Sequence, residues 1–270
     1  MRLTPRVLHL SAKVVLGNLT GQGFEPEVPF LKYVVAPTDT CLHVGASDGR
    51  HTFVMSRLTP QGKVVAFEPS AFSYAVLCNV VAAHRLANVQ TFNLAVADAD
   101  EDITLTTPVK PNGNLGRSFS MIDRAPETGI KRSDIAMIGE RHQKVHCIAL
   151  DGFCAAHGIA HVDFIRCDVE GAEARVLAGG QAMLARCLPN ILVELHPMAL
   201  QTAFGTTAEA VRDGLLAMGY RMFHVNAGRL VASEAIIPGT WSDYFFVHPS
   251  RVRALPEGPF RAAMLPVAVG

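Results

Sequence analysis

The stretch "CLHVGASDGR", residues 41–50, decides the fold class, because an apolar run leads there directly into a turn of small residues. Gly45 and Gly49 stand in this turn, and glycine lets a backbone come close to a ligand. In an open α/β sheet, ligands bind outside the carboxyl ends of the strands, where the amides of the following helix face them. The stretch therefore predicts a strand, a ligand-binding turn and a helix.

Short β-branched runs alternate with helical stretches on both sides of this turn. Such alternation is typical of an α/β fold with a mostly parallel sheet and helices on both faces. We expect helices to begin near His51, Ala71, Ala172 and Thr207, with Ser70 as an N-cap. Seven strands are expected, at residues 40–44, 63–67, 89–93, 162–167, 190–195, 221–225 and 243–248.

Residues 101–150 do not follow the alternation. Two strand-like pieces, 102–108 and 143–151, flank a long segment that is rich in turn formers and charges. We interpret this region as an inserted β-hairpin whose long excursion is a substrate loop, because long loops in compact domains are often functional. Asn114, Arg117 and Ser118 offer the donors and acceptors that bind hydroxyl groups. A variable surface insertion is the alternative interpretation.

The overall charge is balanced, with 24 Lys and Arg against 24 Asp and Glu. No net field attracts nucleic acid or an anionic membrane, so a small-molecule or glycan partner is expected. No uninterrupted apolar run approaches the ~20 residues that span a bilayer. The six cysteines form no C-x-x-C pair and are interpreted as reduced core residues of a cytoplasmic protein.

The 270 residues, 49% of them hydrophobic, can form one large domain with its own core. We assign residues 40–250 to this domain and residues 1–39 to an N-terminal capping segment. The capping segment is expected to hold an amphipathic helix rather than a signal peptide, because His9 and Lys13 interrupt its apolar part. Residues 251–270 form a C-terminal tail, whose apolar end suits a docked segment, a subunit contact or disorder.

Glu68 ends the second strand, about 20 residues after Gly45. At that spacing an acid reaches the hydroxyl groups of a bound ribose, and an ionised carboxylate can accept two hydrogen bonds from a cis-diol. An NAD-dependent oxidoreductase is one possibility. The G-x-x-x-G spacing argues against it, because it lacks the third glycine of the dinucleotide fingerprint.

Several motifs, in one order over roughly residues 25–248, resemble the FkbM family of S-adenosylmethionine-dependent methyltransferases. They are "HVGASDGRHT", "GKVVAFEP", "NLAVAD", "ALDGF", "DFIRCDVEGAEARVLAGG", "ILVELHP" and "GY". The resemblance implies a Rossmann-like class I methyltransferase fold. It also implies methyl transfer from S-adenosylmethionine to a hydroxyl group of a sugar, a glycan or another secondary metabolite.

The resemblance further implies a set of cofactor-binding residues. Gly45, Ala46, Ser47 and Gly49 would cradle the methionine, Glu68 the ribose, and Asn93 and Ala95 would lie beside the adenine. His43 stands where the family usually has an aspartate that helps to hold the cofactor's ammonium group, and Ser47 where it usually has asparagine. An imidazole accepts only one hydrogen bond, and only when neutral. These two departures leave open a non-catalytic cofactor-binding or scaffolding domain.

Methyl transfer to a hydroxyl group needs positioning and removal of the hydroxyl proton. Asp168, at the end of the fourth main strand, is the first candidate for contact with the cofactor's ammonium group or for orienting the acceptor. Glu170 is the second candidate. The alternative is that these acids only complement a helix N-terminus, and this is the favoured interpretation of Glu173.

Glu194 and His196 lie on one face of the next strand. His196 is a candidate general base, and Glu194 is expected to contact the acceptor. Asp168, Glu194 and His196 could bind a divalent cation, but their spacing is not diagnostic and no metal site is predicted. Trp241 could stack on a sugar or anchor the core, and a core position is expected. The other histidines, His51 among them, show no constellation.

Overall fold

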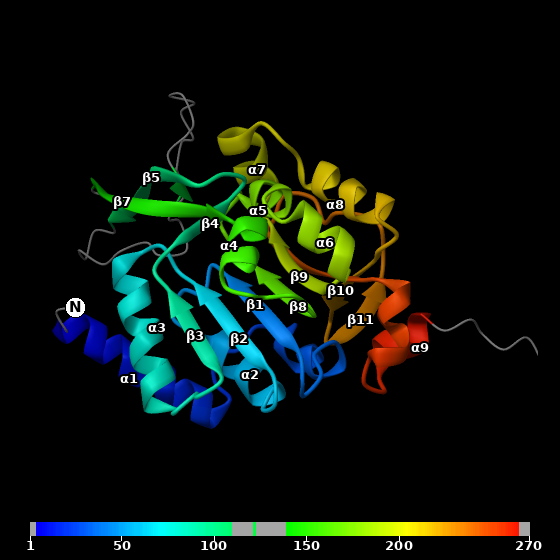
Figure 1. Ribbon diagram of the computed structural model, residues 1–270, viewed down its shortest axis with the longest axis horizontal. Helices are drawn as coiled ribbons and strands as arrows, with labels where there is room; N and C mark the ends of the chain where they lie inside the picture. Colours follow the sequence, from blue (N-terminus) through cyan, green and yellow to red (C-terminus); the bar gives the residue numbers. More distant parts are fainter. Residues whose placement is uncertain (1–3, 110–120, 123–138, 265–270) are drawn as a thin grey trace, which may run out of the picture.

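The computed structural model describes residues 4–109, 121–122 and 139–264. Its main sheet has eight strands in the order β11-β10-β12-β9-β8-β1-β2-β3 (Figure 1). Their bounds are β1 Thr40–Val44, β2 Lys63–Phe67, β3 Val89–Phe92, β8 Phe164–Cys167, β9 Asn190–Leu195, β10 Arg221–Asn226, β11 Arg229–Ala232 and β12 Ser242–Val247. All seven expected strands are present.

β11 is an additional strand at the edge of this sheet, where it pairs antiparallel with β10. It is short and mostly exposed, so its sequence shows no alternation of apolar and polar residues. β3, β2, β1, β8 and β9 run parallel, whereas β12 and β10 are antiparallel to their neighbours. The expected mostly parallel α/β core is confirmed, and the carboxyl ends of its strands meet at one edge.

Helices cover both faces of the sheet (Figure 1). They are α1 Pro5–Thr20, α2 Arg50–Leu58, α3 Ala71–Ala83, α4 Leu150–Ala156, α5 Glu173–Ala178, α6 Gln181–Cys187, α7 Pro197–Phe204, α8 Ala208–Ala217 and α9 Pro259–Met264, with 3-10 helices η1 Val28–Tyr33 and η3 Pro249–Ala254. α2, α3, α5 and α8 begin within a residue of the expected positions. The Ser70 hydroxyl caps α3 by accepting from the Ser73 amide.

Alternate residues of each central strand supply two cores. Leu42 and Ile165 point to the core that α4, α5, α6 and α8 complete. Cys41 and Phe164 point to the opposite core, which contains residues of η1, α2 and α9. Because both faces are covered, the parallel strands are mostly apolar, and the polar residues within them, such as His43 and Arg166, stand out.

The predicted inserted hairpin is confirmed. β5 (Glu101–Val109) pairs antiparallel with β7 (Gly139–Ala149), and β4 (Ala95–Ala97) and β6 (Met121–Ile122) complete a second sheet in the order β4-β7-β5-β6. The expected substrate residues Asn114, Arg117 and Ser118 lie outside the described residues, and their role stays a prediction.

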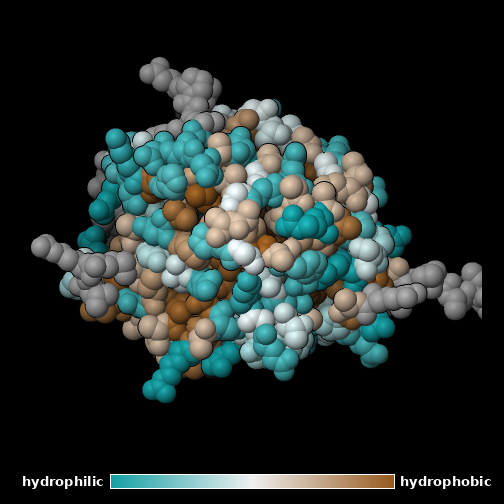
Figure 2. Space-filling view, viewed as in Figure 1, coloured by the Kyte–Doolittle hydropathy of each residue, from teal (hydrophilic) through white to brown (hydrophobic). Residues whose placement is uncertain are grey.

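The segments on either side of residues 40–250 pack against the sheet and its helices. α1 packs on α3 through Val7, Val14 and Val80, and Phe260 of α9 is buried against β10 and β12. All six cysteines are free, and five of them are buried. The face seen in Figure 2 intersperses hydrophilic and hydrophobic residues. Within the described part of the chain, no helix has the length and apolar character needed to cross a membrane.

Candidate functional site

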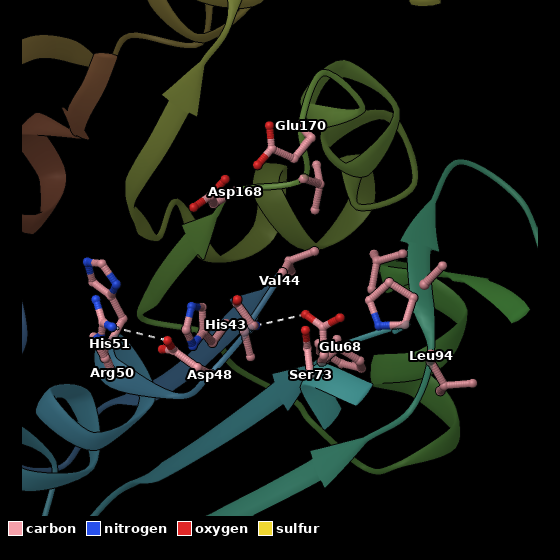
Figure 3. Close-up of a pocket in the computed structure, with 18 of the residues that line it drawn as sticks. His43, Val44, Asp48, Arg50, His51, Glu68, Ser73, Leu94, Asp168 and Glu170 are labelled. Atoms are coloured by element: carbon pink, nitrogen blue, oxygen red, sulfur yellow. Dashed lines mark hydrogen bonds and ion pairs between the residues drawn. The ribbon is translucent and has the colours of Figure 1, made fainter. Parts of the chain in front are cut away.

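A cavity of about 360 Å³ lies at the carboxyl ends of β1, β2 and β8 (Figure 3). This volume is within the range of small-molecule sites. The predicted site residues that line it are His43, Gly45, Ala46, Ser47, Glu68, Ala95, Asp168 and Glu170. Of the other predicted residues within the described ranges, Gly49, Asn93, Glu194 and His196 are not part of the lining.

Gly45 sits where the ends of β1 and β8 come closest. Its φ of +80° lies in the left-handed region, and a Cβ atom placed on it would lie only 1.7 Å from the backbone oxygen of Asp168. The amides of Gly45 and Ala46 both donate to the Phe67 carbonyl at the end of β2. The tight turn that the sequence predicted therefore needs glycine, because no side chain fits between these strands.

Glu68 is held rigidly at the end of β2, with 6% of its surface exposed. Its Oε2 accepts from the Ser47 amide and its Oε1 from the Ser70 amide, both at 2.8 Å. Asn93 donates to the backbone carbonyls of Glu68 and Pro69, so it supports this corner without lining the cavity. The carboxylate is thereby placed at the wall of the cavity without freedom to turn away.

His43 is only 3% exposed, and its Nδ1 lies 2.7 Å from the Thr52 hydroxyl. Burial, together with the nearby His51 and Arg166, holds the pKa of His43 well below its ordinary value. The imidazole is therefore neutral at neutral pH. It fills the wall of the site and brings no charge to a ligand.

Arg166 is a buried cation beneath the cavity, 2% exposed. It donates to Asp168 Oδ2 at 3.2 Å, and its Nη1 lies 2.8 Å from Asp243 Oδ1. Burial lowers the pKa of Arg166, but these carboxylates more than reverse the effect, so it stays charged. The pairing orients Asp168, whose side chain is half-buried at the end of β8.

Asp168, Glu170 and Glu194 bring carboxylate oxygens within 4.8 Å of one another. Burial, followed by the charge of Asp168, raises the pKa of Glu170 to about 9 and that of Glu194 to about 10. Glu194 hydrogen-bonds Asp168. At neutral pH Glu170 and Glu194 therefore keep their protons. Carboxylate oxygens this close together suit a hard cation. Protonated carboxyl groups can lie equally close together without a cation, because they do not repel one another.

His196 stands apart from this group as the N-cap of α7. Its Nδ1 accepts from the Ala199 amide, so the neutral imidazole carries its proton on Nε2 and has no second acceptor nitrogen. Its ring stacks on Trp241, with centroids 5.8 Å apart and planes 21° apart. Trp241 is 57% exposed, so the expected core position is wrong. Trp241 directly precedes β12, so it lies beyond the end of the strand, where the core no longer covers its side chain.

The methyltransferase FkbM domain model matches residues 43–222, which is more than half of the chain. The chain belongs to the FkbM methyltransferase family. This FkbM domain is 25% identical over 169 residues to "Methyltransferase 1" of Beauveria bassiana, a match covering 60% of this chain and 68% of the relative. It is 26% identical over 151 residues to the "2-O-methyltransferase NoeI" of Sinorhizobium fredii, covering 56% of this chain and 60% of the relative.

Similarity also extends to "Methyltransferase sdnD" of Sordaria araneosa, 27% identical over 164 residues, covering 56% of this chain and 63% of the relative. The matched segments thus span 60% to 68% of the length of these curated relatives. A crystal structure of a methyltransferase FkbM from Methylobacillus flagellatus aligns with 91% of this chain and 56% of its own, with 13% identity and a TM-score of 0.47.

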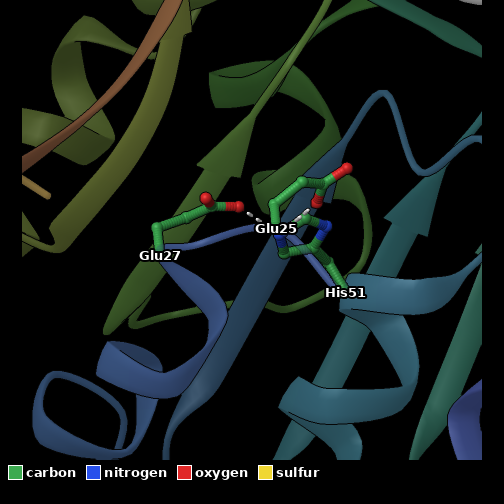
Figure 4. A group of neighbouring side chains, drawn as sticks. All are labelled: Glu25, Glu27 and His51. Atoms are coloured by element: carbon green, nitrogen blue, oxygen red, sulfur yellow. Dashed lines mark hydrogen bonds and ion pairs between the residues drawn. The ribbon is translucent and has the colours of Figure 1, made fainter. Parts of the chain in front are cut away.

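Sequence reasoning missed one cluster of this FkbM domain, formed by Glu25, Glu27 and His51 (Figure 4). His51 Nε2 lies 3.3 Å from Glu25 Oε2 and 3.1 Å from Glu27 Oε1. Glu25 and His51 also line the cavity. The two glutamates precede the sheet and His51 follows the first strand, so no sequence spacing relates them.

Proposed function

We propose that this FkbM domain transfers a methyl group from S-adenosylmethionine to a hydroxyl group of a sugar-containing small molecule or glycan. The observation that carries the proposal is the order of environments along the cavity. Leu94, at one end of the cavity in Figure 3, is followed in sequence by the apolar lining residues Ala95 and Val96, and Glu68 lies nearer the middle. The rest of the lining consists of the Gly45 turn and of charged side chains such as Asp48, Arg50 and Asp168. An adenine, a ribose and a charged amino acid follow one another in the same order in S-adenosylmethionine.

The residues present fit this cofactor. The Glu68 carboxylate is fixed at the cavity wall by two backbone amides, and a carboxylate is the group that best accepts hydrogen bonds from ribose hydroxyl groups. Because Gly45 has no side chain, the ends of β1 and β8 lie close together, and this holds the Gly45 turn and Asp168 side by side in the cavity lining. In this proposal His43, Gly45, Ala46 and Ser47 surround the methionine, and Gly49 supports them as the N-cap of α2. Ala95 lies beside the adenine, and Asn93 holds the Glu68 corner.

When bound, S-adenosylmethionine supplies a methyl group activated by a sulfonium. Transfer to a hydroxyl group forms a C–O bond as the S–C bond breaks, leaves its electron pair on sulfur and releases the hydroxyl proton. Asp168 is the proposed acceptor of that proton, because Arg166 orients it in the cavity lining. Glu170 lies next to it and bounds the acceptor, and Glu194 holds Asp168 from behind.

His196 is better suited to a wall of the acceptor site than to a general base, because its Nδ1 lone pair is used in capping α7. The exposed Trp241 beside it offers a flat apolar face, a surface on which sugar rings stack. The relative NoeI is described as a 2-O-methyltransferase, which supports oxygen as the methylated atom. The predicted loop residues Asn114, Arg117 and Ser118 would complete the acceptor site.

Methyl transfer from radiolabelled S-adenosylmethionine to a panel of mono- and oligosaccharides tests the proposal. We expect transfer to at least one sugar. Asp168→Asn should lower its rate about 100-fold or more, while the exposed Asp213→Asn changes nothing. EDTA should leave the rate unchanged, because the proposed proton acceptor is the carboxylate of Asp168 and not a metal-bound group. Cofactor binding without transfer to any acceptor would favour the non-catalytic interpretation, and tight NAD binding instead would favour the oxidoreductase.

The cellular setting stays a prediction. The five buried free cysteines are consistent with a reducing compartment such as the cytoplasm. The balanced charge gives no reason to expect a nucleic-acid partner.

A further inference from the structure

We propose that Glu25 binds the ammonium group of the cofactor's methionine, and that His51, anchored by Glu27, is the positioning residue that holds Glu25 there. The inference rests on the proposed function and deepens it. It names a residue that lies outside every motif on which the family resemblance depends.

The place of the amino-acid part follows from the shape of the cavity. In Figure 3, Leu94 lies at one end, Glu68 lies in the middle, and Asp48, Arg50 and His51 lie at the other end. A ligand with its base beside Leu94 and its ribose on Glu68 extends its remaining part toward that far end. Glu25 lines the same cavity and contacts His51, so it belongs to this end.

The ammonium group of an amino acid needs an anionic partner, and His43 cannot supply one because it is buried and neutral. Most acids of the cavity lining are already engaged by groups of the protein. Asp48 pairs with Arg50 at 3.4 Å, Glu68 accepts two amides, and Asp168 pairs with Arg166. Glu170 keeps its proton at neutral pH.

Glu25 differs from these acids because its side chain is 49% exposed, and the His51 nitrogen that it contacts is shared with Glu27. Burial raises the pKa of Glu25 above its ordinary value, and His51 only partly opposes this. The carboxylate is thus short of positive charge, and a bound ammonium group would supply it.

The support behind Glu25 is a buried hydrogen bond between Glu27 and His51. Glu27 is only 2% exposed. Burial raises the pKa of Glu27, but the hydrogen bond and charge of His51 outweigh this and lower it overall. Glu27 is therefore ionised, and it anchors the Nε2–H of His51 at 3.1 Å. The same edge of the ring faces Glu25, so the ring fixes where that carboxylate lies (Figure 4).

Two ligands separate the ammonium contact from the rest of the site. S-Adenosylhomocysteine carries the ammonium group, whereas 5′-methylthioadenosine has the base and ribose but no amino-acid part. By isothermal titration, we expect Glu25→Gln to weaken S-adenosylhomocysteine about tenfold and to leave 5′-methylthioadenosine within about twofold. The exposed Glu257→Gln is the matched control and should change neither affinity.

His51 is tested in the same way. His51→Ala should weaken S-adenosylhomocysteine selectively, and His51→Gln should restore part of the affinity, because its amide can donate toward Glu25 and Glu27. A merely structural role of His51 would weaken both ligands alike, and this result would overturn its role as a positioning residue.

Other outcomes are equally distinct. If the unmodified protein binds neither ligand, the proposed function fails and this inference with it. If both ligands bind but Glu25→Gln weakens them equally or not at all, only the inference fails. Tight binding of Zn²⁺ to the ligand-free protein, lost in Glu25→Gln, would instead make the cluster a metal site and would also overturn the inference.

Discussion

At the scale of single residues, Gly45 is the position on which the site depends most. Its φ is +80°, and a Cβ atom there would lie 1.7 Å from the backbone oxygen of Asp168. Replacing the glycine forces the ends of β1 and β8 apart, and a close contact with backbone has no flexible side chain to relieve it. The cavity wall and the stability of the sheet therefore depend on the same residue.

We expect Gly45→Ala to lower the free energy of unfolding by about 3 kcal/mol or more. Gly152→Ala is the matched control, because Gly152 lies within α4 with open space around its Cα atom. Alanine there should raise the free energy of unfolding, by at most about 1 kcal/mol. Urea denaturation measures both variants, and similar small effects at the two glycines would contradict the packing at Gly45.

Three of the predicted site residues that line the cavity, Gly45, Glu68 and Asp168, each directly follow a parallel strand. Gly45, Glu68 and Asp168 could be predicted because parallel strands bring their carboxyl ends to one edge. Glu25 could not, because it precedes the first strand and no sequence spacing relates it to the other residues of the cavity. The exposure of Trp241 was not predicted either. A tryptophan next to a strand is usually buried, and the sequence does not show that this one lies beyond the strand's end.

At the scale of secondary-structure elements, the ends of β8 and β9 place Asp168, Glu170 and Glu194 together. Burial is the main cause that raises the pKa of Glu194 to about 10. In the unfolded chain a glutamate loses its proton near its ordinary pKa of 4.5. Between these values the folded state holds a proton that the unfolded state has released, so stability falls as the pH rises.

We therefore expect the free energy of unfolding to decline between pH 6 and pH 9, by at most about 1.4 kcal/mol per pH unit for each such carboxyl group. Glu194→Gln removes one of these groups and should make the decline shallower, whereas the exposed Glu257→Gln should not. Denaturant unfolding at a series of pH values tests this. An unchanged slope in Glu194→Gln would show that Glu194 is ionised in the folded protein.

The element pattern was the part of the fold most accessible from sequence. All seven expected strands and the inserted hairpin are present, because β-branched runs and turn formers mark them directly. β11 escaped prediction because it is an exposed edge strand without a buried face. The antiparallel direction of β10 and β12 also depends on tertiary pairing, which periodicity alone does not encode.

At the scale of the whole molecule, one cavity joins three parts of the chain: the segment before the main sheet, the ends of its strands, and the second sheet, which contains the inserted hairpin. Glu25 comes from the first part, Glu68 and Asp168 from the second, and Ala95 and Leu105 from the third. An apolar end, a rigid carboxylate and a charged end follow one another along it. This sequence of environments is the basis for proposing S-adenosylmethionine as the ligand.

The central claim is that this cavity binds the cofactor, with its ribose on Glu68. Isothermal titration with S-adenosylhomocysteine tests it most directly, with Glu68→Gln as the variant and Glu257→Gln as the control. We predict saturable one-to-one binding by the unmodified protein. We also predict about a tenfold loss in Glu68→Gln for both S-adenosylhomocysteine and 5′-methylthioadenosine, since both carry the ribose. The absence of binding to the unmodified protein, or full affinity in Glu68→Gln, would contradict the claim.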